Sequence, residues 1–152
     1  MLLIILTFCS FILASTPETS GDQFEKIFQT LKSDDPSSIK QIFGSPDKVD
    51  SKDPKYDMYL YDSKNKLMPM KFFIDRKRNE VFSVALTYWV NFDAYAFLKK
   101  RFKDFNWIEA PIKSTAVDVV EERFKVQIPD LGMTFEYDNQ DALRRPMWIF
   151  FK

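Results

Sequence analysis

Carboxylates are the side chains of this sequence best suited to chemistry. Glu121 and Glu122 are the candidate general acid and base, since a glycosidase needs only two carboxylates across a cleft. Adjacent residues on a regular strand point to opposite faces, so these two side chains cannot line one cleft. We therefore expect one solvated and one ion-paired carboxylate and predict no catalytic residue. A hydrolase that works through carboxylates alone is the least favoured alternative.

A second group of carboxylates could in principle bind calcium. The segment DKVDSKDPKYD contains Asp47, Asp50, Asp53 and Asp57. It lacks the spacing and the mid-loop glycine of an EF-hand, and lysines interrupt it. A solvated loop is the favoured interpretation, and the sequence predicts neither a metal site nor a cofactor.

Several function classes are excluded by what the sequence lacks. It contains no histidine, and its single cysteine is Cys9, so Ser-His-Asp and Cys-His catalysis and His-based zinc sites are ruled out. Neither common nucleotide-binding glycine motif occurs. Lys plus Arg and Asp plus Glu number 22 each, so the net charge is zero. With no long-range positive field, the basic runs DRKRNE, KKRFK and LRRPMW are interpreted as solvated surface, and no nucleic-acid partner is predicted.

The first residues, MLLIILTFCSFILAS, are typical of a secretory signal. Their apolar run of about fourteen residues would span only ~21 Å as a helix, short of the ~30 Å hydrocarbon core. We predict a signal peptide over 1–15, a flexible N-terminus over 16–21, and export to the periplasm or the medium. Phe8 stands where a lipidation site has a small residue, so a membrane tether through Cys9 is disfavoured.

The remaining chain alternates between helical and strand periodicity. Apolar spacing predicts a helix over 22–32, and Asp34 or Asp35, Pro36 and Gly44 supply the cap, first residue and exit of a second helix. A later helix and six strands are predicted at 91–105 and at 56–62, 68–75, 80–90, 115–128, 132–137 and 146–151.

This pattern predicts an α+β fold with short helices packed on one face of an antiparallel sheet, in the order α-α-β-β-β-α-β-β-β. Residues 22–152 are expected to form a single domain. Two related halves, 22–90 and 91–152, are the alternative.

Three features of residues 22–90 carry a resemblance to a known family. They are the helix exit Ile42, Phe43, Gly44 and Pro46, the aromatic strand Tyr56, Tyr59 and Tyr61, and the turn into a valine strand through Phe72, Asp75 and Val81. In these features the segment resembles the SmpA/OmlA (BamE-like) family of small bacterial envelope proteins. The resemblance implies a compact α-α-β-β-β unit that binds other proteins and catalyses nothing. Over the whole mature chain, the arrangement is also similar at the fold level to the β-lactamase inhibitor proteins, whose joined sheets present an aromatic-rich face to a target enzyme.

Aromatic residues make up 16% of the chain, and alternation divides those of the strands between two faces. The predicted core face comprises Met58, Leu60, Met70, Phe72, Ile74, Phe82, Val84, Leu86, Met147, Ile149 and Phe151. The opposite face, and the candidate partner-binding site, comprises Tyr59, Tyr61, Phe73, Trp89, Trp148 and Phe150.

A solvent-facing sheet surface should be mostly polar, so this second aromatic face needs an explanation. One interpretation is a second core beneath another layer, and the other is a recognition surface, where Tyr and Trp are common. The sequence thus predicts an exported, non-catalytic protein-binding module of the cell envelope that docks a partner through this face. The alternative is a small-ligand protein in which the same aromatics line a lipid or carbohydrate groove.

Overall fold

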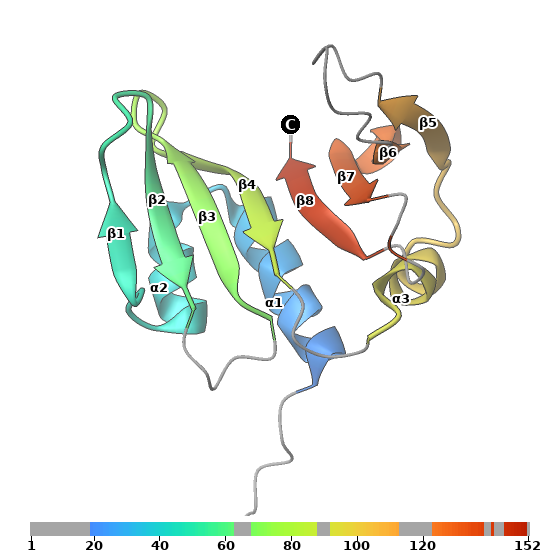
Figure 1. The fold of residues 1–152 in the computed structure, drawn as a ribbon, viewed down its shortest axis with the longest axis horizontal. Helices are drawn as coiled ribbons and strands as arrows, with labels where there is room; N and C mark the ends of the chain where they lie inside the picture. The colour runs from blue at the N-terminus through green and yellow to red at the C-terminus, as the bar shows by residue number, and fades with distance from the viewer. Residues whose placement is uncertain are drawn as a thin grey trace, which may run out of the picture.

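A computed structural model describes residues 19–62, 68–87, 92–112, 123–138, 141 and 145–151. Residue 151 is described for its backbone alone. Within these ranges, three α-helices and one 3-10 turn accompany an eight-stranded antiparallel sheet (Figure 1). The predicted α+β class is therefore confirmed. The helices are α1 (Ser20–Ser33), α2 (Pro36–Phe43), α3 (Ala94–Arg101) and the 3-10 turn η1 (Pro129–Leu131). The strands are β1 (Lys48–Asp50), β2 (Tyr56–Tyr61), β3 (Met70–Asp75), β4 (Glu80–Leu86), β5 (Ile108–Ile112), β6 (Arg123–Ile128), β7 (Met133–Asp138) and β8 (Pro146–Phe151).

The element order differs from the predicted one by two strands, β1 and β5. Both lie at the edges of the sheet, where only one side of a strand is hydrogen-bonded. β1 has three residues, and its one apolar side chain, Val49, is 50% exposed. β5 contains Pro111, which an edge strand tolerates because its missing N–H can face outward. Neither strand alternates between buried apolar and exposed polar residues, which is the pattern that identifies a strand in a sequence.

The two N-terminal helices begin and end at side chains suited to those positions. Thr19 caps α1 in a reciprocal arrangement with Asp22, so the helix starts two residues before the predicted boundary and includes part of the stretch expected to be flexible. Of the two predicted caps of α2, Asp34 and Asp35, it is Asp35 that caps the helix, accepting from the N–H of Ser37 at 2.8 Å. Gly44 ends α2 at a φ of 78°, a backbone conformation that favours glycine.

The third helix is shorter than the predicted 91–105. Asp93 accepts a hydrogen bond from the N–H of Ala96 at 2.9 Å, and the helix ends before Phe102. The indole N–H of Trp107 then donates to the carbonyl of Phe102 at 2.9 Å. The same carbonyl also accepts from the backbone N–H of Phe105 at 3.2 Å, so two donors fix the chain where it leaves the helix.

The strands form one continuous sheet in the order β1-β2-β3-β4-β8-β7-β6-β5. The first four strands are adjacent in chain order, and the last four are adjacent in reverse order. β4 and β8 join the two groups through the pairs Ser83 with Phe150, Val84 with Ile149, and Ala85 with Trp148. We call this junction the join. That the two groups are related in sequence stays a prediction.

The hydrophobic core lies between the sheet and the helices. Figure 1 shows α1 and α2 behind strands β1 to β4. From α1, Phe28 packs edge-on against Phe102 at 5.3 Å and Phe135 at 6.4 Å between ring centroids. On α2, Phe43 lies 5.3 Å from Phe72 of β3. Through these ring pairs, α1 contacts the end of α3 and strand β7 of the second group, whereas α2 contacts strand β3 of the first group.

Candidate interaction surface

Aromatic side chains gather on the sheet face opposite the helices, which we call the helix-free face. Register places Phe73 of β3 and Phe150 of β8 beside Ser83 of the intervening strand β4. Trp148 lies beside Ala85 on the same face. Together with rings from β2 and β4, they form a cluster that we call the aromatic row: Tyr56, Phe73, Phe82, Trp148 and Phe150.

The rings of the aromatic row contact one another continuously from β2 to β8. Tyr56 lies 5.5 Å from Phe73, and Phe73 lies 5.2 Å from Trp148, measured between ring centroids. Trp148 and Phe150 are nearly parallel, with centroids 6.0 Å apart and an interplanar angle of 13°. The tilted and edge-on pairs are within the range that aromatic rings prefer. The row is therefore a packed surface and not a set of scattered side chains.

No helix of the described residues covers the aromatic row. Its members are half-buried, and each contacts at least one neighbouring ring of the row. Beneath them Ser83 is fully buried, and its hydroxyl has no hydrogen-bond partner among the described residues. The rings of the aromatic row therefore shield this position of β4 from solvent.

Beyond β8 the helix-free face becomes polar. Glu136 of β7 lies beside Trp148 on one side and Lys125 of β6 on the other. In the next position on this face, Thr134 lies between Phe150 and Gln127. An apolar centre bordered by polar side chains is the usual composition of a protein interface.

The structure brings together three of the predicted site residues: Phe73, Trp148 and Phe150. Trp89 lies outside the described residues. The other two, Tyr59 and Tyr61, were predicted on this face but lie on the opposite one. The two faces of β2 are therefore exchanged relative to the prediction: Tyr59 and Tyr61 face the helices, and Met58 lies beside Phe73 on the helix-free face.

Tyr61 is fully buried against the helices because its polar end finds a partner there. Its hydroxyl donates to the carbonyl of Gly44 at 2.8 Å, and its ring packs edge-on against Phe72 at 5.9 Å. Burial, with smaller contributions from Tyr59 and Asp47, raises the pKa of Tyr61 to about 12. Tyr59 is half-buried on the same side, and the ammonium group of Lys40 lies 5.2 Å from its ring centroid.

Sequence reasoning missed Tyr56 and placed Phe82 in the core. The pairing of β3 with β4 shifts between Phe73 and Ile74, so β4 contains one extra residue there. Such a bulge reverses the alternation on one side of it, which puts Phe82 on the helix-free face. Tyr56 could have been found once β2 was assigned the correct sense, because it shares a face with Met58, the partner of Phe73.

The carboxylates considered for chemistry do not form a site in the described residues. Asp57 instead accepts from Arg76 at 2.6 Å, and this hydrogen bond holds the pKa of the carboxyl below its usual range. No group of three or more His, Cys, Asp or Glu suited to a metal ion occurs in the described part of the chain. Glu121 and Glu122 lie outside it.

Comparisons with known proteins found one distant structural neighbour. No family model and no curated protein matches the chain. A crystal structure of an extracellular protein containing an SCP domain from Bacillus anthracis matches with a TM-score of 0.47 and 13% identity. The match covers 88% of this chain and 46% of that one, so this chain spans less than half the length of its neighbour. Among the described helices, none combines the length and apolar character needed to span a membrane. The resemblance to the SmpA/OmlA family stays a prediction.

Proposed function

We propose that this chain is an exported, non-catalytic protein-binding module that docks its partner on the aromatic row. The observation that carries the proposal is the contact between Phe73 and Trp148 over β4, 5.2 Å between centroids, on a sheet face that no described helix covers. Contact between water and such an apolar row is unfavourable, and a partner that covered the row would remove this surface from solvent.

The composition of the face favours a protein as the occupant. Trp and Tyr offer large, rigid contact area and are enriched among the residues that dominate binding energy. The row includes both, at Trp148 and Tyr56, and the side chains beside it include Glu136 and Thr134. A partner surface with an apolar centre and polar margins would match this arrangement. The resemblance to envelope proteins that bind other proteins supports the same function.

Export rests on the N-terminal apolar run and on its small-residue end at Ala14 and Ser15. The full chain expressed in its source cells should be recovered outside the cytoplasm without its first fourteen or fifteen residues. N-terminal sequencing and the intact mass of the exported protein measure this. Recovery of the complete chain from the cytoplasm would contradict export without bearing on the aromatic row.

Partner binding is tested by capture with two matched variants. The immobilised protein is exposed to an extract of the source cell envelope, and retained proteins are identified by mass spectrometry. We expect a partner that binds wild-type protein and the Gln127→Ala variant but not Trp148→Ala, because Gln127 lies on the same face outside the row. The interaction is then measured with purified partner by calorimetry, with circular dichroism to show that the variants are folded.

The result that would overturn the proposal is equally specific. A purified partner whose affinity is the same for wild type and for folded Trp148→Ala and Phe73→Ala variants does not use the aromatic row. Failure of every envelope or extracellular protein to bind wild-type chain would contradict the module function itself.

A further inference from the structure

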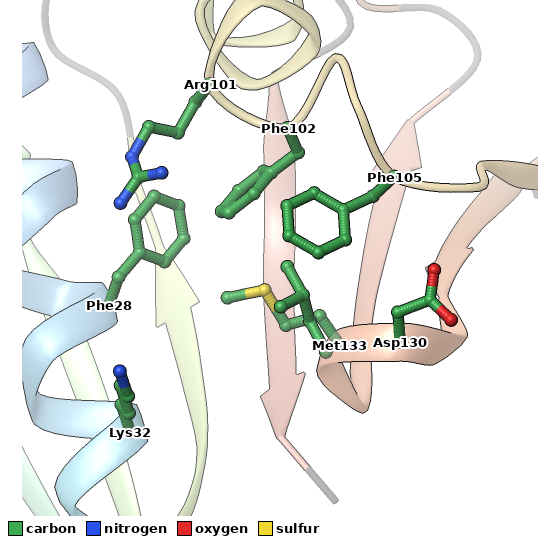
Figure 2. A pocket seen from close by; sticks show the side chains of 8 residues that line it. Phe28, Lys32, Arg101, Phe102, Phe105, Asp130 and Met133 are labelled. Atoms are coloured by element: carbon green, nitrogen blue, oxygen red, sulfur yellow. The ribbon is translucent and has the colours of Figure 1, made fainter.

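A second candidate site lies on the other side of the sheet, in a cavity of about 360 Å³ between α1, the end of α3 and η1. Its walls are mostly apolar. Figure 2 shows the rings of Phe28, Phe102 and Phe105 around the side chain of Met133. Phe28, Phe102 and Met133 are themselves nearly fully buried, so these walls are held in place by the core. This volume lies within the range of small-molecule sites, roughly 300–1,000 Å³.

Two cationic side chains stand on one wall of the cavity. Lys32 comes from the last turn of α1 and Arg101 from the last residue of α3, and Figure 2 shows them on either side of Phe28. Lys32 has no ion pair among the described residues. Arg101 uses its Nε to bind Glu25 at 2.7 Å, which leaves the two terminal nitrogens of its guanidinium for another acceptor.

The negative charge of the cavity is on the opposite side. Asp130 lies at the far wall, on η1, in Figure 2. A ligand with one anionic end is therefore attracted to the wall formed by Lys32 and Arg101 and repelled from the η1 wall. The separation of charges across an apolar floor would give such a ligand one favoured orientation.

We propose that this cavity binds a monocarboxylate with an unbranched apolar body, such as a medium-chain fatty acid. The carboxylate would lie at the wall that carries Lys32 and Arg101, and the hydrocarbon would lie against Phe102, Phe105 and Met133. The cavity volume of about 360 Å³ corresponds to roughly a dozen water molecules at ~30 Å³ each, which suits a ligand of about a dozen non-hydrogen atoms, such as a ten-carbon fatty acid. This proposal does not depend on the aromatic row, because the two surfaces are on opposite faces of the sheet.

Decanoate is the probe, and decyltrimethylammonium is its control with the same chain length and opposite charge. Binding is followed by calorimetry and by NMR of the methionine methyl groups, because Met133 lines the cavity. We expect decanoate to shift the Met133 methyl resonance and to bind at least tenfold more tightly than the cationic amphiphile. Octanoate and dodecanoate should bind more weakly than decanoate if the volume sets the chain length.

Three variants at the cavity and one matched control outside it separate this site from general surface binding. Lys32→Ala and Arg101→Ala should each weaken decanoate binding roughly two- to fivefold, as expected for the loss of one exposed charge contact. Lys100→Ala is the matched control, since it removes an exposed cation from the same helix end outside the cavity. Leu131→Trp, at a half-buried wall position, should fill the cavity and abolish the Met133 shift in a protein with an unchanged circular dichroism spectrum.

Three outcomes would overturn the proposal. The first is no shift of Met133 up to the solubility limit of decanoate. The second is equal affinity for the cationic amphiphile, because the wall of Lys32 and Arg101 would then play no part. The third is decanoate binding that Leu131→Trp leaves unchanged.

Discussion

Replacement of Trp148 by alanine distinguishes a docking surface from a second core. Trp148 makes two ring contacts among the described residues, with Phe73 at 5.2 Å and with Phe150 at 6.0 Å. Each aromatic pair contributes roughly 0.5–1.5 kcal/mol, so their loss should lower the free energy of unfolding by about 1–3 kcal/mol. A substitution without effect on stability is expected only for an isolated side chain, and Trp148 is not isolated.

Phe135→Ala is the matched substitution in the core. Phe135 is fully buried on the helix side and contacts Phe28, Phe102 and Trp107 through its ring. Truncation of a buried phenylalanine costs roughly 3–5 kcal/mol, since the lost transfer free energy and the new cavity add. We therefore expect Phe135→Ala to be more destabilising than Trp148→Ala by about 2 kcal/mol.

The assay is urea unfolding followed by far-ultraviolet circular dichroism, which does not depend on the tryptophan that is removed. Equal slopes of free energy against urea concentration would show that the variants unfold from comparable states. A loss of 3–5 kcal/mol for Trp148→Ala, equal to that of a buried core aromatic, would refute the reasoning. In that case the helix-free face is a second core, and the proposed docking surface is wrong.

Two further predictions concern the exit of α2. Burial raises the pKa of Tyr61 to about 12, so the folded state holds this proton more tightly than the unfolded chain does. The stabilising contribution of the protonated Tyr61 is complete below the ordinary tyrosine pKa of about 10 and is lost as the pH rises toward 12. We therefore expect the difference in unfolding free energy between wild type and Tyr61→Phe to be smaller at about pH 11.5 than at about pH 9, as measured by urea titration. Tyr56→Phe serves as the control. Gly44→Ala should lower the free energy of unfolding by about 1–3 kcal/mol through the backbone conformation alone, because no atom lies within 4 Å of the added Cβ. A neutral Gly44→Ala would contradict the need for glycine at this exit.

The elements that could be predicted from the sequence are those whose signals are local. α2 is the clearest example, since Asp35, Pro36 and Gly44 each act within the helix or next to it. The turn between β3 and β4 is another, where the carboxylate of Asp75 accepts from the N–H groups of Lys77 and Arg78 at 2.9 Å. In these places the residue type determines the backbone conformation without help from the rest of the fold.

The candidate site could be predicted only in part because its sheet face depends on distant contacts. β2, with the sequence YDMYLY, has large apolar residues in both alternating sets, so periodicity cannot decide which set is buried. Which set is buried depends on two contacts of Tyr61. Its hydroxyl donates to the carbonyl of Gly44, and its ring lies 5.9 Å from that of Phe43. Neither contact can be inferred from β2 itself.

The surplus of phenylalanine, sixteen in the chain, has a physical explanation at the join. β4 and β8 are joined by three register pairs, whereas β2 and β3 share six. So short a backbone contact needs side-chain packing across it. On the helix side, Phe28 supplies this packing through Phe135, and on the helix-free face Phe73 supplies it through Trp148.

The same requirement explains where the two candidate sites lie. The aromatic row crosses the join on one face, from β2 and β3 to β8, and the cavity crosses it on the other, from α1 to α3 and η1. We propose that the partly exposed rings on the helix-free face receive a protein and that the open cavity on the helix side receives a carboxylate with an apolar body. Both surfaces therefore lie near the junction of two groups of strands, across which Phe28 and Phe135 pack on one face and Phe73 and Trp148 on the other.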